Sequence, residues 1–205
     1  MQTLTATLVT DGSSDRVLLP IIDFLMNEYS PIPFRTAFAQ GARKGTLAQR
    51  VTQAYADYPC NLLFVHRDAE GAAIADRELE IGQAAATLQQ APQTVQVIPV
   101  RMTESWLLTD ASAIRAAAGN STGEMALGLP AITRIETLPD PKSVLFAALV
   151  KAKDLGARRR ANIRPEALRH RVAELIDDYA ALRQLASFQH LELQVRTYFH
   201  THHQA

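Results

Sequence analysis

The sequence predicts an α/β protein with a mainly parallel sheet of about four strands flanked by helices, followed by a C-terminal helical extension. Three observations lead to this fold class. Short apolar runs bounded by turn residues recur through residues 1–100, amphipathic helical patterns separate them, and strand patterns stop after Arg101. Such alternation favours parallel strands, because each crossover helix returns the chain to the same end of the sheet.

Four segments are typical of strands. Residues 3–10, 61–66 and 94–100 are short, rich in β-branched or large apolar residues, and bounded by breakers. This is the pattern of buried strands. Residues 32–40 are a weaker fourth candidate, because apolar and polar residues alternate only partly there.

Helical patterns fill the spaces between these strands. Ser13 or Ser14 is a suitable N-cap for the first helix, and Pro20 predicts a kink within it. Thr46 is a suitable cap for the second helix, and residues 72–90 form an alanine-rich third. The predicted order is therefore β-α-β-α-β-α-β.

The remainder of the chain is predicted to be helical. Its expected segments are one or two short helices from Glu104, a loop over 119–141, helices over 142–154 and 165–187, and a last helix to about Phe199. The apolar stripe of residues 165–187 indicates a helix packed on a core. We therefore place an α/β core at residues 1–110 and a helical extension at residues 111–205, together forming one structural unit.

Composition narrows the class of protein without identifying a ligand. The chain has 205 residues, of which 47% are hydrophobic, and it carries 21 basic and 21 acidic residues. This balance is ordinary for a globular protein, and only the local distribution of charge bears on nucleic-acid binding. The single Cys60 fits a reducing cytosol, and no signal peptide or membrane span is evident. We expect a soluble cytoplasmic protein.

Acidic residues follow the predicted strands. In chain order they are Asp11, Asp15, Asp68, Glu70 and Glu104. Because the carboxyl ends of parallel strands meet at one edge of a sheet, we expect these carboxylates to gather there. Gathered carboxylates repel one another unless cations bind between them, and oxygen-only ligands favour Mg²⁺ or Mn²⁺. Asp11, Asp15 and Glu104 lie near predicted helix starts, and for any one of these three, helix capping is an equally good explanation.

Three familiar acidic motifs fit the first strand end poorly. The stretch "DGSSD" overlaps the metal site of von Willebrand A-type domains, but Asp15 stands where that site needs a hydroxyl. A haloacid-dehalogenase motif would require a second aspartate where Ser13 stands. A response-regulator reading lacks both the acidic pair and the late lysine.

A fourth pattern fits better. The stretches "DGSSD", "RDAEG" and "PVRMTESWLLTD" resemble the signatures EGxTD, RDxD and P-V-x-x-x-E-x-W-L-L-x-D of TOPRIM-like proteins. The TOPRIM domain occurs in topoisomerases, primases and OLD-family nucleases, and the chain is most similar to bacterial TOPRIM-like proteins encoded beside ABC-type ATPases. The resemblance covers about residues 5–110, and Trp106 and Asp110 make its third motif specific.

This resemblance implies a divalent-metal-dependent nuclease or nicking subunit. Its substrate would be DNA, with RNA as a second option, and it would serve a bacterial anti-phage defence system with an ABC-type ATPase partner. All five carboxylates would be catalytic. The resemblance implies Mg²⁺ or Mn²⁺ at Asp15, Asp68, Glu70 and Glu104, with Asp11 activating or positioning the attacking water.

Two departures from the family pattern leave catalysis open. Asp11 replaces the leading glutamate, and Glu70 replaces the second aspartate of the pair. One shortened and one lengthened carboxylate either preserve the cavity or mark a site that has lost cleavage. The alternative function is therefore a subunit that binds an ATPase, nucleic acid or a phage component without cleaving.

Basic residues suggest where nucleic acid would bind. Arg43 and Lys44 lie between two glycines after the second predicted strand, and the densest cluster contains Arg158, Arg159 and Arg160. Such clusters supply phosphate attraction, although charge runs also decorate solvated helices. Near the acidic pair, His66 is expected in the core, while Arg67 is a candidate either to neutralise the carboxylates or to touch the substrate.

Overall fold

The computed structural model describes residues 3–39, 45–154 and 164–202. The chain forms two compact units, one of residues 1–98 with 189–205 and the other of residues 99–188. The division falls between residues 98 and 99, and the end of the chain belongs to the first unit.

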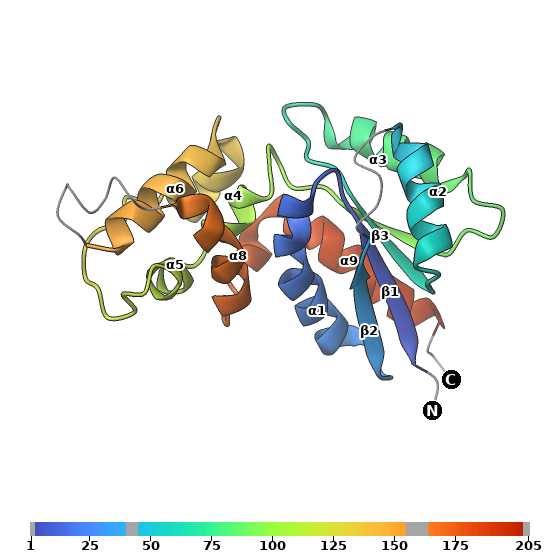
Figure 1. Ribbon diagram of the computed structural model, residues 1–205, viewed down its shortest axis with the longest axis horizontal. Coiled ribbons are helices and arrows are strands. Elements are labelled where there is room, and N and C mark those ends of the chain that lie inside the picture. Colours follow the sequence, from blue (N-terminus) through green and yellow to red (C-terminus); the bar gives the residue numbers. More distant parts are fainter. Residues whose placement is uncertain (1–2, 40–44, 155–163, 203–205) are drawn as a thin grey trace. The chain divides into compact units, whose positions relative to one another are not determined.

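The first unit is a four-stranded, all-parallel sheet with helices around it (Figure 1). Its elements are β1 (Leu4–Val9), a 3₁₀ turn (Ser13–Val17), α1 (Leu18–Tyr29), β2 (Phe34–Phe38), α2 (Leu47–Asp57), β3 (Leu62–His66), α3 (Ile74–Ala85), β4 (Gln93–Val97) and α9 (Ala186–His202), whose first residues belong to the second unit. The α/β class and the parallel sheet predicted from the sequence are thereby confirmed, including the weaker second strand.

The strand order is β2-β1-β3-β4. The chain moves from β1 outward to β2, then crosses back over β1 to β3, so the direction of winding reverses between β1 and β3. Right-handed crossovers then place α1 on one face of the sheet and α2 with α3 on the other. The carboxyl ends of β1 and β3 form the switch point, where ligands bind in sheets of this type.

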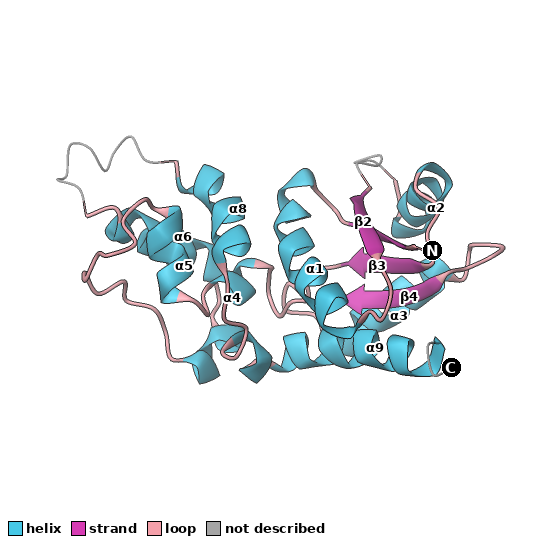
Figure 2. Ribbon diagram, turned by 90° about the horizontal axis from the view of Figure 1, so that it is seen from below, coloured by secondary structure: helices cyan, strands magenta, loops and turns pink. Residues whose placement is uncertain are grey.

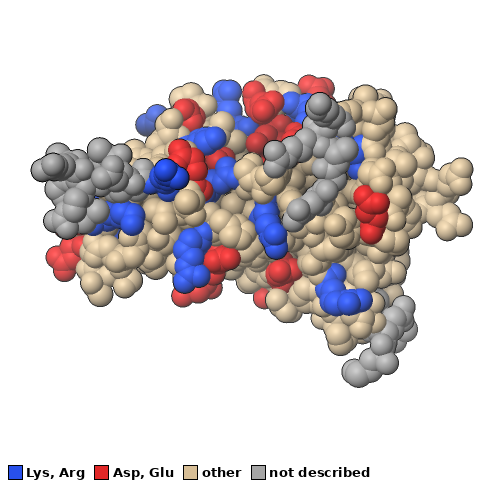
Figure 3. All heavy atoms as spheres, viewed as in Figure 1, with Lys and Arg blue, Asp and Glu red and all other residues tan. Residues whose placement is uncertain are grey.

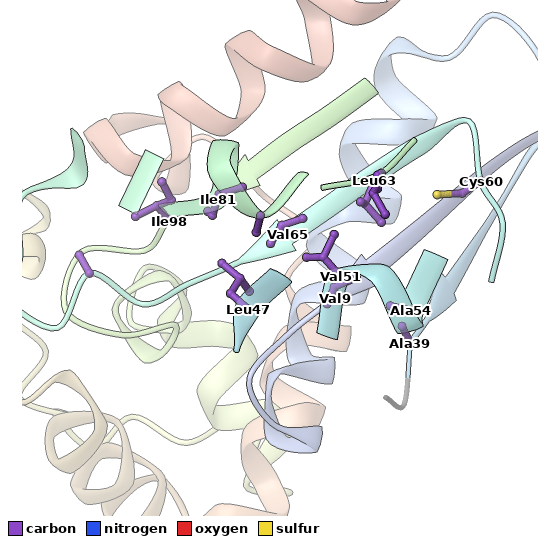
Figure 4. Packing of buried hydrophobic residues seen from close by; sticks show 13 residues of the cluster. Val9, Ala39, Leu47, Val51, Ala54, Cys60, Leu63, Val65, Ile81 and Ile98 are labelled. Atoms are coloured by element: carbon purple, nitrogen blue, oxygen red, sulfur yellow. The ribbon is translucent and has the colours of Figure 1, made fainter. Parts of the chain in front are cut away.

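Buried apolar side chains hold α2 and α3 against the sheet. Val9, Leu63 and Val65 from the strands meet Val51 of α2 and Ile81 of α3 (Figure 4). The strand residues alternate along the chain, since side chains on one face of a strand lie two residues apart. Every residue of β3 is buried, as expected for a central parallel strand covered on both faces.

The last helix protects the outer edge of β4 (Figure 2). The Gln96 backbone N–H donates to Gln194 Oε1 at 2.9 Å, and Gln194 Nε2 donates to the Gln96 carbonyl at 3.1 Å. One side-chain amide therefore satisfies both outward-facing backbone groups of Gln96. This contact removes part of the open strand edge that would otherwise pair with another chain.

Two helix starts in this unit can be compared with the caps predicted from the sequence. Thr46 caps α2 as predicted, because its Oγ1 accepts from the Gln49 N–H while the Gln49 side chain accepts from the Thr46 N–H. Neither Ser13 nor Ser14 caps α1, which is preceded by the 3₁₀ turn and has no side-chain cap. Pro20 lies in the first turn of α1, where a missing N–H costs no helical hydrogen bond, rather than in the helix interior.

The second unit is helical. Its elements are α4 (Glu104–Leu107), α5 (Ala111–Ala117), a 3₁₀ turn (Ile132–Thr137), α6 (Pro141–Ala152), α8 (Pro165–Leu175) and a second 3₁₀ turn (Leu182–Gln184). The predicted helix over 165–187 is wrong in its second half, because α8 ends at Leu175. Ile176 is extended, and the Asp178 carboxylate accepts from the Ala180 N–H, a local bond that competes with a helical one. The predicted loop over 119–141 contains the first 3₁₀ turn.

Among the described residues, no helix is both long and apolar enough to cross a membrane.

Candidate functional site

Three of the predicted acidic residues lie at the carboxyl edge of the sheet. Asp11 and Asp15 follow β1, and Asp68 follows β3, which pairs directly with β1 through Leu8–Phe64 and Val9–Val65. Parallel pairing in this register brings the two loops out side by side. Of the five carboxylates expected to gather at this edge, these three follow two neighbouring strands, and the charges of all three act on the same histidine, His66.

Asp15 is bound to its own loop. The Gly12 N–H donates to its Oδ2 at 3.2 Å, and the Ser14 hydroxyl donates to its Oδ1 at 3.3 Å. The Thr10 hydroxyl donates to the Gly12 carbonyl at 2.7 Å, which fixes the start of the same turn. The capping explanation therefore applies to Asp15, which shapes the loop that carries Asp11.

His66 lies between two carboxylates. Its Nε2 is 3.0 Å from Asp68 Oδ1, and its Nδ1 is 3.7 Å from Asp15 Oδ2. A carboxylate only accepts hydrogen bonds, so Nε2 carries a proton. The ring is buried. Burial lowers the pKa of His66, but the Asp68 hydrogen bond and the charges of Asp68, Asp15 and Asp11 outweigh burial and raise the pKa above its ordinary value.

His66 has a second role besides the core position that its sequence context suggests. It is a core histidine, as expected from the end of a buried strand, and it also joins the two loops that carry the acidic residues. One ring nitrogen faces Asp15 and the other faces Asp68, so the ring lies between the two carboxylates.

Asp11 sits between two arginines. Its Oδ1 lies 2.6 Å from Arg50 Nη1, and its Oδ2 accepts from Arg67 Nη1. Oδ1 is buried and makes no hydrogen bond of good geometry, so its contact with Arg50 is a charge contact. The expectation that Arg67 neutralises the acidic residues is supported by this ion pair.

The ion pairs continue from Asp11 across the edge of the sheet. Arg67 Nη2 is 3.2 Å from Glu80, Arg77 Nη1 is 2.8 Å from Glu80, and Arg77 Nη2 is 3.6 Å from Glu70. Arg77 Nε also donates to the Asp68 carbonyl at 3.1 Å. We call this alternating chain of charges the edge network. It consists of Arg50, Asp11, Arg67, Glu80, Arg77 and Glu70.

Glu70 stands at the outer end of the edge network. Its side chain is 70% exposed, and its backbone has φ 53°, a left-handed conformation that non-glycine residues adopt in tight turns. The following Gly71 has φ 98°. The turn after β3 therefore carries Asp68 inward toward His66 and Glu70 outward toward solvent.

Glu104 lies in the second unit and has its own partner there. It begins α4, is buried, and accepts a hydrogen bond from Arg169 Nη1 of α8. Trp106 of the same helix is fully buried, donates from Nε1 to the Ser187 hydroxyl at 2.8 Å, and meets Phe188 edge-on with ring centroids 5.7 Å apart. These contacts tie the "ESWLLTD" stretch into the interior of the second unit.

The predicted nucleic-acid contacts lie outside the described residues. Arg43, Lys44 and the triplet Arg158 to Arg160 all fall in the undescribed segments 40–44 and 155–163. On the face shown in Figure 3, basic and acidic side chains of the described residues are interspersed. Nucleic-acid binding by those five residues stays a prediction.

Three members of the edge network escaped the sequence reasoning, namely Arg50, Arg77 and Glu80. They lie on α2 and α3, among residues of ordinary amphipathic helices, where charged positions normally face solvent. The only sequence signal was their proximity to helix starts that follow strands, where side chains reach the carboxyl edge of the sheet. That signal does not separate them from neighbouring charged residues.

The donor chemistry fits a hard divalent cation. Asp11 and Asp68 offer carboxylate oxygens, and Asp11 Oδ1 is a buried acceptor without a hydrogen bond, which a cation would satisfy. Within the described parts of the chain, however, no three His, Cys, Asp or Glu residues are grouped closely enough to hold a metal ion. Arginine and histidine side chains stand between the carboxylates instead. Cation binding at Asp11 would therefore replace an arginine contact.

Comparisons with protein-family models, with curated proteins and with solved structures found no match for this chain.

Proposed function

We propose that this chain is a TOPRIM-like, divalent-metal-dependent nuclease or nicking subunit that acts on phosphodiesters at the carboxyl edge of its sheet. The observation that supports this most is that Asp11 and Asp68 follow β1 and β3 at the switch point of the sheet, with Arg50 and Arg67 beside Asp11. Carboxylates suit a cation, and guanidinium groups suit a phosphate. A phosphodiester with its metal ion needs both kinds of group.

In this proposal Asp68 and Asp11 hold the cation, and Glu70 would join them by giving up its contact with Arg77. Mg²⁺ or Mn²⁺ would supply activation of a water and stabilisation of the leaving oxygen. His66 fixes Asp68 through its hydrogen bond, and Arg77 fixes the Asp68 backbone. Asp15 holds the loop that presents Asp11. The described residues thus divide into carboxylates that face the ligand and groups that position them.

The resemblance in sequence adds the biological setting to this proposal. DNA is the proposed substrate, and an ABC-type ATPase in an anti-phage system is the proposed partner. The family pattern would also assign Glu104 to the metal ion; in this chain that carboxylate is buried in the second unit and accepts a hydrogen bond from Arg169.

A second candidate function is a subunit that binds its partners without cleaving. One observation favours it: both oxygens of Asp11 face guanidinium groups, so neither oxygen is open to a cation while those contacts persist. The side chain of Asp11 is also shorter than the family glutamate and reaches less far toward a ligand.

A cleavage assay separates the two functions. Supercoiled plasmid and single-stranded oligonucleotides are incubated with the protein and Mg²⁺ or Mn²⁺, with and without the neighbouring ATPase. We expect metal-dependent cleavage that is lost in Asp68→Asn. Asp76→Asn is the matched control, since Asp76 is exposed on α3. Cleavage equal in both variants contradicts this site, and binding without cleavage under every condition favours the second function.

A further inference from the structure

Arg50 differs from the other two arginines of the edge network. Arg67 contacts both Asp11 and Glu80, and Arg77 contacts Glu80, Glu70 and the Asp68 carbonyl. Among the described residues, Arg50 has Asp11 as its sole ion-pair partner. Loss of the Asp11 contact would therefore leave Arg67 paired and Arg50 unpaired.

The contact between Arg50 and Asp11 leaves hydrogen-bonding capacity unused on both sides. Arg50 Nε is a buried donor without a hydrogen bond, and Asp11 Oδ1 is a buried acceptor without one. A guanidinium group has five donor hydrogens in a fork that matches two oxygens of a phosphate. The Arg50 side chain is only 12% exposed, so an unpaired charge there would be costly.

These facts set the order of preference among the possible bound states. A phosphate that takes Arg50 alone leaves Asp11 with one arginine and brings a second anion next to it. A cation that takes Asp11 alone leaves Arg50 buried without a counter-charge. When both bind, the phosphate pairs with Arg50 and the cation pairs with Asp11, so every charge keeps an opposite neighbour. Each ligand then favours the other.

We propose that Arg50 is a phosphate-binding residue that exchanges Asp11 for a backbone phosphate of nucleic acid, and that a divalent cation at Asp11 promotes this exchange. The inference rests on the proposed function for the identity of the two ligands. It adds a binding residue on α2 and a rule of coupling: cation and phosphate bind together more tightly than either binds alone.

The test measures binding rather than cleavage. The probe is a short fluorescein-labelled single-stranded oligonucleotide, followed by anisotropy in EDTA or in Ca²⁺, a hard cation that binds carboxylate oxygens. For the natural sequence we expect Ca²⁺ to tighten binding by roughly 5- to 150-fold, the usual range for coupled ligands. The reciprocal titration of Ca²⁺, with and without oligonucleotide, should show the same factor.

Two substitutions give opposite results. Asp11→Asn removes the charge that holds Arg50, so we expect tighter oligonucleotide binding in EDTA and no further gain from Ca²⁺. Arg50→Gln should bind weakly under both conditions. Arg35→Gln is the matched control, because Arg35 is an exposed arginine on β2, and it should behave as the natural sequence does. Thermal unfolding of each variant checks that the fold is retained.

Several outcomes would overturn the inference. It fails if Ca²⁺ leaves oligonucleotide affinity unchanged, if Asp11→Asn gains no affinity in EDTA, or if no oligonucleotide binds at all. Coupling seen with inorganic phosphate but not with the oligonucleotide would assign Arg50 to a small phosphate ligand instead. Cleavage without coupled binding of Ca²⁺ and oligonucleotide would retain the proposed function and reject the exchange. Coupled binding without cleavage would retain the exchange and reject the nuclease function.

Discussion

The two units each contain a carboxylate paired with arginine, and the surroundings of the pairs differ. Asp11 in the first unit has a side chain that is 37% exposed, and it shares charge with two arginines. Glu104 in the second unit is 4% exposed, and its partner Arg169 is 10% exposed. A half-exposed carboxylate can change partners at small cost because water replaces what is lost. A buried pair is held by the cost of separating it. The comparison identifies Asp11 as the carboxylate suited to exchange partners.

The largest effect is expected at the buried pair. Glu104→Ala leaves the Arg169 guanidinium buried without a counter-charge, and the free energy of unfolding should fall by about 3–5 kcal/mol. Urea unfolding of the purified protein measures this change. The double variant Glu104→Leu with Arg169→Met should recover most of the loss, since both charges are then gone. A loss below about 1 kcal/mol in the single variant would place the pair with exposed salt bridges.

A smaller effect is expected at Trp106, in the same stretch of the second unit. Trp106→Phe removes the indole donor and leaves the buried Ser187 hydroxyl without it, so the free energy of unfolding should fall by about 1–3 kcal/mol. Trp106→Phe combined with Ser187→Ala should be less destabilised than the sum of the two single variants. Simple additivity would show that the bond contributes nothing of its own.

His66 should make the stability of the first unit depend on pH. Its folded pKa is raised above the ordinary value of about 6.5, so the folded state holds a proton that the unfolded state releases. The stabilisation is complete below the unfolded pKa and is lost as the pH rises through the folded pKa, with a slope of at most ~1.4 kcal/mol per pH unit.

Urea unfolding in metal-free buffers of increasing pH measures this decline in the free energy of unfolding. His66→Gln should flatten it, and the exposed His200 serves as the control substitution. A free energy of unfolding that rises with pH over this range would mean that burial outweighs the carboxylates in setting the pKa of His66.

The smallest effect on stability is expected at Asp11. Asp11→Asn removes the charge of a side chain that is 37% exposed but keeps an amide oxygen that can still accept from Arg50, so the metal-free protein should lose only about 1 kcal/mol of unfolding free energy. The comparison with Glu104→Ala, under identical conditions, is the sharpest test of the difference between the two regions. Equal losses in both variants would make Asp11 a structural residue.

Much of the fold could be predicted because a buried strand has a recognisable pattern over a short stretch of sequence. Short runs such as residues 61–66 are apolar throughout, since a central parallel strand is buried on both faces. The helix over 165–187 could not be placed correctly by the same reasoning. Ile176, Tyr179, Leu182 and Leu185 are all buried, so their spacing reports burial, although the backbone there is not α-helical. Periodic burial without a helix is indistinguishable from a helix in sequence alone.

The sequence by itself determined that Asp11, Asp15 and Asp68 follow strands, because chain connectivity carries each of them to the same edge of a parallel sheet. Only the tertiary structure decided which arginine each carboxylate pairs with. Arg50 reaches Asp11 from α2, and Arg169 reaches Glu104 from α8, across long stretches of chain. The reason is the length of the arginine side chain, whose charge lies far from its backbone. Its partner is therefore set by how the helices pack, and no local pattern records that choice.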